Sequence, residues 1–63
     1  MQKLKLFIDT QMSQTQLAEK LGVSQPTVSD WVNGNTRPSF ERLADLSRIT
    51  GISIEDLVKE AIA

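Results

Sequence analysis

Small polar side chains gather on one face of a short predicted helix, residues 25–33. Of all the side chains in this sequence, they are the best suited to specific chemistry. Helical spacing places six of them on or beside that face: Gln25, Pro26, Thr27, Ser29, Asp30 and Asn33. Amide, hydroxyl and carboxylate groups at this spacing can pair with base edges in a DNA major groove. The pattern fits equally well an ordinary helical hairpin whose polar face is only solvated.

Catalytic chemistry has little support in the composition. The chain contains no histidine, cysteine or tyrosine. It also lacks a glycine-rich phosphate loop, an HExxH pair and a nucleophile elbow. Its carboxylates lie mostly at helical surface positions or in first turns. We therefore expect no enzyme activity, no metal site, no cofactor and no small-molecule substrate.

The polar face belongs to a stretch, residues 13–33, that reads as two short helices joined by a tight turn. Ser13 and Gln16 have the spacing of a capping box, which starts the first helix. Gly22 supplies the left-handed residue that ends it, and Ser24 offers an N-cap for the second helix. A helix, a glycine-containing turn and a second helix form the layout of a helix-turn-helix.

The apolar residues of this stretch predict how its two helices meet. Ala18 is small and lies four residues before Gly22, where two steeply crossing helices would nearly touch. Val28 and Trp31 point back toward the first helix. For Trp31 this spacing favours a partly buried core position over a stacking platform for a ligand.

Three more helices are expected, which makes the fold class all-α with five helices. Residues 2–10 form the first, a helix capped by Ser39 ends near Gly51, and Ser53 opens the last. Residues 34–38 read as a polar loop with no apolar anchor. The expected inward positions of these helices are Leu4, Phe7 and Ile8; Phe40, Leu43, Ala44, Leu46 and Ile49; and Ile54, Leu57, Val58, Ala61 and Ile62.

Length and hydropathy predict one small domain over residues 1–63. With 63 residues and no cysteine, the core must come from close helix packing, to which a partner subunit can contribute. No apolar run approaches the roughly 20 residues of a membrane span, and no signal-peptide core is present. A cytoplasmic location without membrane contact is the expectation.

The charge balance argues against a DNA-binding protein, although its distribution weakens the objection. Seven basic and eight acidic residues give a net charge of −1, whereas DNA-binding domains are usually basic. Residues 1–42 carry five basic and four acidic groups, and residues 43–63 carry two and four. The excess acid thus lies away from the polar face. The low isoelectric point predicts weak and salt-sensitive DNA binding.

The run SQTQLAEKLGVSQPTVSDWVNGNTRPS, followed by a helix, a Gly-Ile-Ser turn and a final helix, resembles the lambda-repressor-like domain of the XRE/Cro regulators. The resemblance extends from about Lys3 to Val58. It implies a compact five-helix fold whose helices 2 and 3 form the helix-turn-helix. It also implies binding to operator DNA as a homodimer, with helix 3 in the major groove.

The resemblance and the polar face together assign expected DNA contacts. Base contacts are expected from Ser24, Gln25, Pro26, Ser29 and Asp30. Phosphate contacts are expected from Gln14, Thr27, Asn33, Asn35, Thr36 and Arg37.

Three of these assignments need comment. Gln25 could be only a first-turn residue, but the motif favours a base contact, with adenine the natural target of its amide. Pro26 departs from the family pattern, because it can offer a base only apolar contact, such as to a thymine methyl. For Asp30 three roles stay open: accepting from cytosine N4, holding a neighbouring side chain, or repelling phosphate.

The sequence also predicts how the chain assembles and what it does. A dimer contact is expected at Ile52, Leu57, Ala61 and Ile62, because the last two come too late in the chain for the monomer core to need them. The expected function is sequence-specific transcriptional regulation on a palindromic operator, of the phage, prophage or antitoxin type. The alternative is a protein-interaction module of the same fold, which binds another regulator or a toxin through its acidic C-terminal third. Steep weakening by salt would indicate DNA binding.

Overall fold

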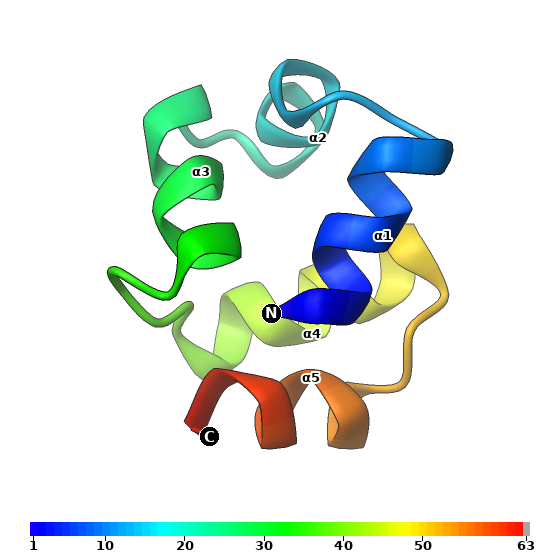
Figure 1. The fold of residues 1–63 in the computed structure, drawn as a ribbon, viewed down its shortest axis with the longest axis vertical. Helices are drawn as coiled ribbons and strands as arrows, with labels where there is room; N and C mark the ends of the chain where they lie inside the picture. Colours follow the sequence, from blue (N-terminus) through cyan, green and yellow to red (C-terminus); the bar gives the residue numbers. More distant parts are fainter. Residues whose placement is uncertain (63) are drawn as a thin grey trace.

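A computed structural model describes residues 1–62, with Ile62 described by its backbone alone. These residues form five α-helices and no strand, which confirms the predicted fold class. The helices are α1 Gln2–Thr10, α2 Gln14–Leu21, α3 Gln25–Asn33, α4 Phe40–Thr50 and α5 Ile54–Ile62. In Figure 1, α3 runs along one edge of the molecule, and the α4–α5 connection runs along the opposite edge. Within residues 1–62 no helix has the length and hydrophobicity needed to cross a bilayer.

The local signals that start and end α2 act as predicted. The Ser13 hydroxyl accepts from the Gln16 amide at 3.1 Å, and the Gln16 side chain accepts from the Ser13 amide at 3.1 Å. Both arms of the capping box are therefore present. Gly22 has φ of +73°, which turns the chain so that the Val23 amide donates to the Ala18 carbonyl at 3.0 Å.

The core draws at least one side chain from every helix. Leu4 of α1, Leu17 of α2, Val28 of α3, Leu46 of α4 and Leu57 of α5 are all fully buried. Around them lie Ala18, Leu21, Trp31 and Leu43, each less than a tenth exposed. Because the apolar face of every short helix meets the same cluster, no helix here is stable without the others.

Two positions predicted to face inward on α4 are wrong. Phe40 is 70% exposed, and Ala44 is also exposed. The buried face of α4 is centred on Leu43 and Leu46, and at 100° per residue Phe40 and Ala44 fall together on its flank. As the first residue of the helix, Phe40 also directs its side chain back beyond the helix end.

The loop after α3 does have an apolar anchor, contrary to the prediction. Pro38 is buried, whereas residues 33–37 and Ser39 are exposed. Ser39 then caps α4, since its hydroxyl accepts from the Arg42 amide at 3.3 Å. The loop is thus fixed at its end, and its polar residues are held on the surface next to α3.

Charged side chains join the two ends of the chain. The Lys3 ammonium lies 2.7 Å from a carboxylate oxygen of Asp56, and the Lys3 backbone amide donates to Glu60 at 2.9 Å. The hydrogen bond between Lys3 and Asp56 holds the pKa of the Asp56 carboxyl below its usual value. The same bond raises the pKa of the Lys3 ammonium. These contacts link α1 to α5.

Candidate nucleic-acid interface

The crossing of α2 and α3 is built from small and apolar side chains. Ala18 is 2% exposed and Val28 has no exposed surface, as expected where two helices approach closely. Trp31 is 4% exposed, which confirms that it belongs to the core. The burial of these residues leaves the opposite face of α3 directed away from the core.

The eleven residues predicted to contact DNA lie in three adjoining segments, which we call the reading face. Gln14 begins α2, seven residues span the N-cap and length of α3, and three follow in the loop. None of them is buried. The exposed members are Ser24, Gln25, Pro26, Asn33, Asn35, Thr36 and Arg37; the half-buried members are Gln14, Thr27, Ser29 and Asp30.

A hydrogen bond between two glutamines joins the first turns of α2 and α3. The Gln25 side-chain nitrogen donates to the side-chain oxygen of Gln14, eleven residues earlier. Sequence reasoning assigned both residues but missed their contact. Their equivalent places, each the first residue of a helix in a helix-turn-helix, are the signal that could have revealed it.

Further side-chain pairs organise the surface of α3. The hydroxyls of Ser24 and Thr27 are hydrogen bonded at 2.8 Å. Ser24 therefore occupies the predicted N-cap position, but its side chain pairs with Thr27 rather than with the backbone. One turn later, the Asn33 amide donates to the Ser29 hydroxyl at 3.4 Å. These pairs orient polar groups at the surface without burying them.

Asp30 connects α3 to the loop that follows. Its backbone carbonyl accepts from the amides of Asn35 at 2.9 Å and Thr36 at 3.5 Å. Its carboxylate accepts from the Asn35 side chain at 3.5 Å. Of the three roles left open for Asp30, the structure thus contains the second, holding a neighbouring side chain. Arg37, two residues beyond these contacts, is exposed.

Of the four residues predicted to form a dimer contact, the structure excludes one. Leu57 is fully buried in the core, so its side chain is not available to a partner and its assignment is wrong. Ile52 precedes α5 and is half-buried, whereas Ala61, also half-buried, lies in the last turn of α5. The side chain of Ile62 lies outside the described residues.

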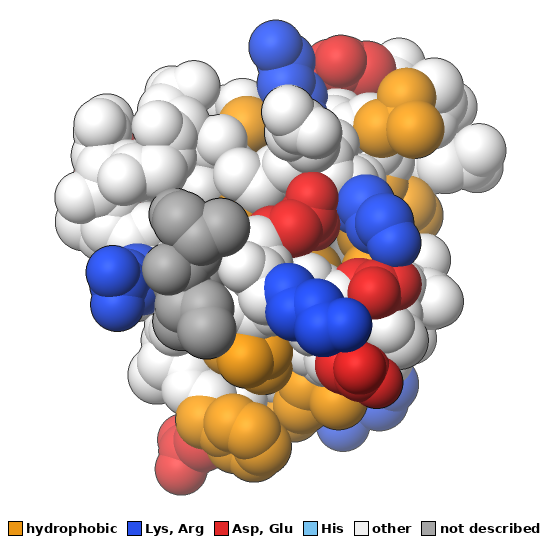
Figure 2. Space-filling view, turned by 60° about the horizontal axis from the view of Figure 1, so that its bottom comes forward, with side chains coloured by type: hydrophobic (Ala, Val, Ile, Leu, Met, Phe, Trp, Pro, Cys, Tyr) orange, Lys and Arg blue, Asp and Glu red, His pale blue; other side chains and the backbone are white. Residues whose placement is uncertain are grey.

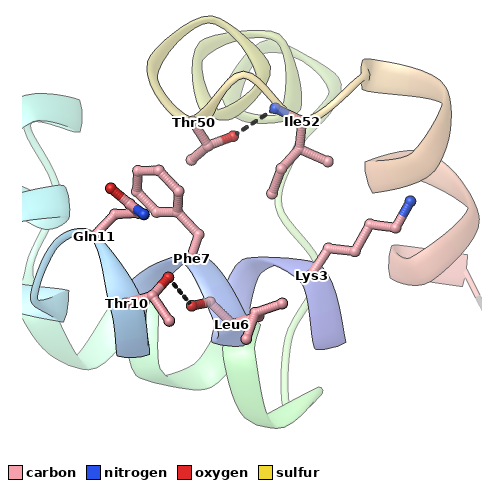
Figure 3. A pocket seen from close by; sticks show the side chains of 7 residues that line it. All are labelled: Lys3, Leu6, Phe7, Thr10, Gln11, Thr50 and Ile52. Atoms are coloured by element: carbon pink, nitrogen blue, oxygen red, sulfur yellow. Dashed lines mark hydrogen bonds between the residues drawn. The ribbon is translucent and has the colours of Figure 1, made fainter.

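Ile52 instead faces α1 across an apolar hollow (Figure 3). The hollow is lined by Lys3, Leu6, Phe7, Thr10, Gln11, Thr50 and Ile52. Leu6 is 63% exposed here. In the connection between α4 and α5, the Thr50 hydroxyl accepts a hydrogen bond from the Ile52 backbone amide at 3.2 Å.

Comparison with known proteins agrees with this geometry. A protein-family model described as helix-turn-helix matches residues 11–57. An uncharacterized HTH-type transcriptional regulator of Haemophilus influenzae is 30% identical over 54 residues, 86% of this chain. The HTH-type transcriptional activator BcrR of Enterococcus faecalis is 36% identical over 47 residues, 75% of this chain.

The chain spans only about a quarter of the length of these relatives, since the matched residues make up 23% of each. No solved structure matches the chain. The family match nevertheless covers α2, the turn and α3 in full, together with all of α4 and the first turn of α5. With five helices in lambda-repressor-like order over residues 1–62, the chain belongs to the XRE-type helix-turn-helix family.

Proposed function

We propose that residues 1–63 act as one sequence-specific DNA-binding domain of a transcriptional regulator, with α3 in the major groove. The observation that carries this proposal is the contact between Gln14 and Gln25, which sets the reading face across two helices. A helical hairpin whose polar face is only solvated does not require the side-chain amides of its two helices to be held in a fixed position relative to each other. The names of the relatives, a transcriptional regulator and a transcriptional activator, support the same role.

The proposed roles within the reading face follow from chemistry and position. Base edges are contacted by the residues on and before the first two turns of α3: Ser24, Gln25, Pro26, Ser29 and Asp30. Phosphates are contacted from the flanks by Gln14, Thr27, Asn33, Asn35, Thr36 and Arg37. Gln14 both approaches phosphate and orients Gln25, because its side-chain oxygen already accepts from the Gln25 amide. A non-catalytic role follows from the same assignment.

The regulator acts, in this proposal, as a homodimer whose two α3 helices lie about 34 Å apart on a palindromic site. We place the contact on the side formed by α4 and α5, which pack against each other. Phe40 and Ala44 are exposed there, one turn apart on α4. Figure 2 shows hydrophobic side chains gathered along one edge of the face on which α5 lies.

The position of Phe40 in the chain favours this side. Phe40 follows Arg37 of the reading face by only three residues. A two-fold axis close to Phe40 therefore keeps both reading faces on the same side of the dimer, as binding to one duplex requires. Ala61, in the last turn of α5, belongs to the proposed contact, whereas Ile52 and Leu57 do not.

A protein-interaction role is the second candidate, and the hollow between α1 and the α4–α5 connection favours it. Leu6 is largely exposed and lines this hollow with Phe7 and Ile52. The α4–α5 connection that borders the hollow runs along the edge of the molecule opposite α3 in Figure 1. A partner protein bound in this hollow would make no use of the reading face.

Selection from a random duplex library decides between the two functions. We expect repeated rounds of capture to enrich a palindromic sequence whose half-sites lie one helical turn apart. Gln25→Ala should relax that enrichment at one base pair of each half-site, while Leu6→Ser should leave it unchanged. Enrichment of no sequence by the parent protein, with the fold intact by circular dichroism, would contradict the DNA-binding proposal.

A further inference from the structure

We infer that the reading face, if it binds DNA as proposed above, recognises it through uncharged hydrogen bonds with almost no net electrostatic attraction. Only two of its eleven residues are charged, Asp30 and Arg37, and their charges cancel. The other nine offer amides, hydroxyls and one proline ring. Affinity for phosphate that does not depend on sequence should therefore be very small, and binding should respond only weakly to salt. This inference departs from the salt-sensitive binding that the isoelectric point led us to expect.

The cations of the chain are largely engaged elsewhere. Lys3 pairs with Asp56 at 2.7 Å, and Lys59 pairs with Glu55 at 3.1 Å. Arg48 lies 2.9 Å from Asp45. Figure 2 shows the result on the face that carries α5, where positive and negative side chains alternate. The charged groups of this face thus pair with one another.

Arg42 lies five residues after Arg37, and its guanidinium is engaged in contacts within the fold. Its guanidinium donates to the Leu21 carbonyl at 2.9 Å and lies 3.8 Å from Asp45. It therefore satisfies the C-terminal end of α2 instead of reaching toward a phosphate.

Lys20 and Lys5 are the remaining lysines, and neither belongs to the reading face. Lys20, in the last turn of α2, lines a hollow with Gln11 and Met12, beside the exposed Glu19. Lys5 lies on α1. Arg37 is thus the only cation among the residues of the reading face, all of which the structure describes.

In this proposal, the carboxylate of Asp30 discriminates between DNA sequences. It is half-buried in the middle of α3, and a distance of 3.5 Å to Asn35 leaves its carboxylate able to accept a further, shorter hydrogen bond. A base amine beside it satisfies the carboxylate, whereas a phosphate beside it is repelled. Duplexes that present no donor at this position are rejected.

The salt dependence of binding measures this inference directly. Each neutralised phosphate contributes about −0.9 to the slope of log K against log salt, and typical proteins contact about six to ten phosphates. A dimer with one Arg37 per subunit should therefore show a slope of only about −2. The partial positive charge at the start of each α2 can steepen the slope to about −3, and the negative charge of each Asp30 can reduce it to about −1.

The experiment uses fluorescence anisotropy with the duplex selected from the random library and a shuffled duplex of the same composition. Titrations between 50 and 200 mM KCl should give a slope between about −1 and −3 for the selected duplex. Arg37→Ala should bring that slope about two units closer to zero in a dimer. A slope steeper than about −4 overturns the inference but leaves DNA binding established.

Asp30→Asn provides the second arm, with Asp9→Asn on α1 as the matched control of equal charge change. Asparagine keeps an oxygen that can accept from Asn35. We expect Asp30→Asn to strengthen binding to the shuffled duplex at 50 mM KCl about threefold to tenfold, and Asp9→Asn less than twofold. Equal gains in both variants would overturn the role of Asp30. Binding to neither duplex would instead contradict the proposed function itself.

Discussion

Gln25 is the residue for which the structure adds most to the proposed function. Its exposed side chain is held by Gln14, so its orientation is set before a duplex arrives. Pre-orientation reduces the side-chain entropy lost on binding. A glutamine can then pair with adenine through both ends of its amide, or through the one end that Gln14 leaves open.

Gln25→Ala should weaken binding to the selected duplex by about 1–3 kcal/mol and relax preference at one base pair. Gln14→Ala should weaken binding less, and the double variant should reveal a coupling of about 0.5 kcal/mol or more because the two side chains are in contact. Anisotropy with a set of single-base variants of the duplex provides the measurement. Unchanged affinity and unchanged base preference would remove Gln25 from the reading face.

At the scale of the element, α2 and α3 are joined by apolar packing in addition to the hydrogen bond between Gln14 and Gln25. Ala18 allows the helices to approach, and Val28 and Trp31 fill the space behind α3. The reading face keeps its geometry only while this packing is intact. Trp31 is the largest side chain involved, so it offers the clearest test.

Trp31→Ala should reduce the free energy of unfolding by about 3–5 kcal/mol through loss of buried surface and formation of a cavity. Leu6→Ala is the control, because it removes an apolar side chain that is 63% exposed and should change stability by less than about 1 kcal/mol. Urea denaturation followed by circular dichroism compares the two. If Trp31→Ala unfolds like the parent but no longer binds DNA, Trp31 is a surface contact.

At the scale of the whole molecule, the contact between Lys3 and Asp56 predicts a stability that depends on pH. The lowered pKa of Asp56 means that its contribution is present above the unfolded-state pKa and is lost as the pH falls through the folded-state pKa. The raised pKa of Lys3 means that its contribution is present below about pH 10 and is lost as the pH rises through the folded-state pKa. The pair therefore stabilises the fold between about pH 4 and pH 10.

Asp56→Asn should lower the melting temperature at pH 7, and its difference from the parent should shrink toward zero below about pH 3. Glu55→Gln is the matched control, since it removes an acid from the same first turn of α5 without touching Lys3. Thermal melts from pH 2 to pH 7 make the comparison. A difference that persists unchanged at pH 2 would show that Asp56 acts through packing and not through its charge.

The proposed dimer is also a property of the whole molecule. Phe40→Asp should shift the protein to monomer and weaken binding to the palindromic duplex much more than to a half-site, because the second reading face is lost. Leu6→Asp is the matched variant at the other exposed apolar site, and it should leave the dimer intact. Sedimentation equilibrium at several concentrations distinguishes them. If only Leu6→Asp dissociates the dimer, the interface lies at the hollow beside Leu6. If the parent protein is a monomer, the dimer proposal is wrong.

The sequence by itself determined the elements of this protein. Ser13, Gln16 and Gly22 specify where α2 begins and ends, because caps and left-handed turns depend on residues only a few positions apart. Periodicity likewise identified Trp31 as a core residue. The family pattern and the membership of the reading face could be predicted for the same reason, since both are carried by one continuous stretch.

Only the tertiary structure decided which side chains meet and which apolar residues remain outside. The flank position of Phe40 and the burial of Pro38 and Leu57 depend on the packing of neighbouring helices, which short-range patterns do not encode. The contact between Gln25 and Gln14 depends in turn on the angle at which α2 and α3 cross. Such contacts join residues far apart in the chain, so they follow from the whole core and from no single segment of it.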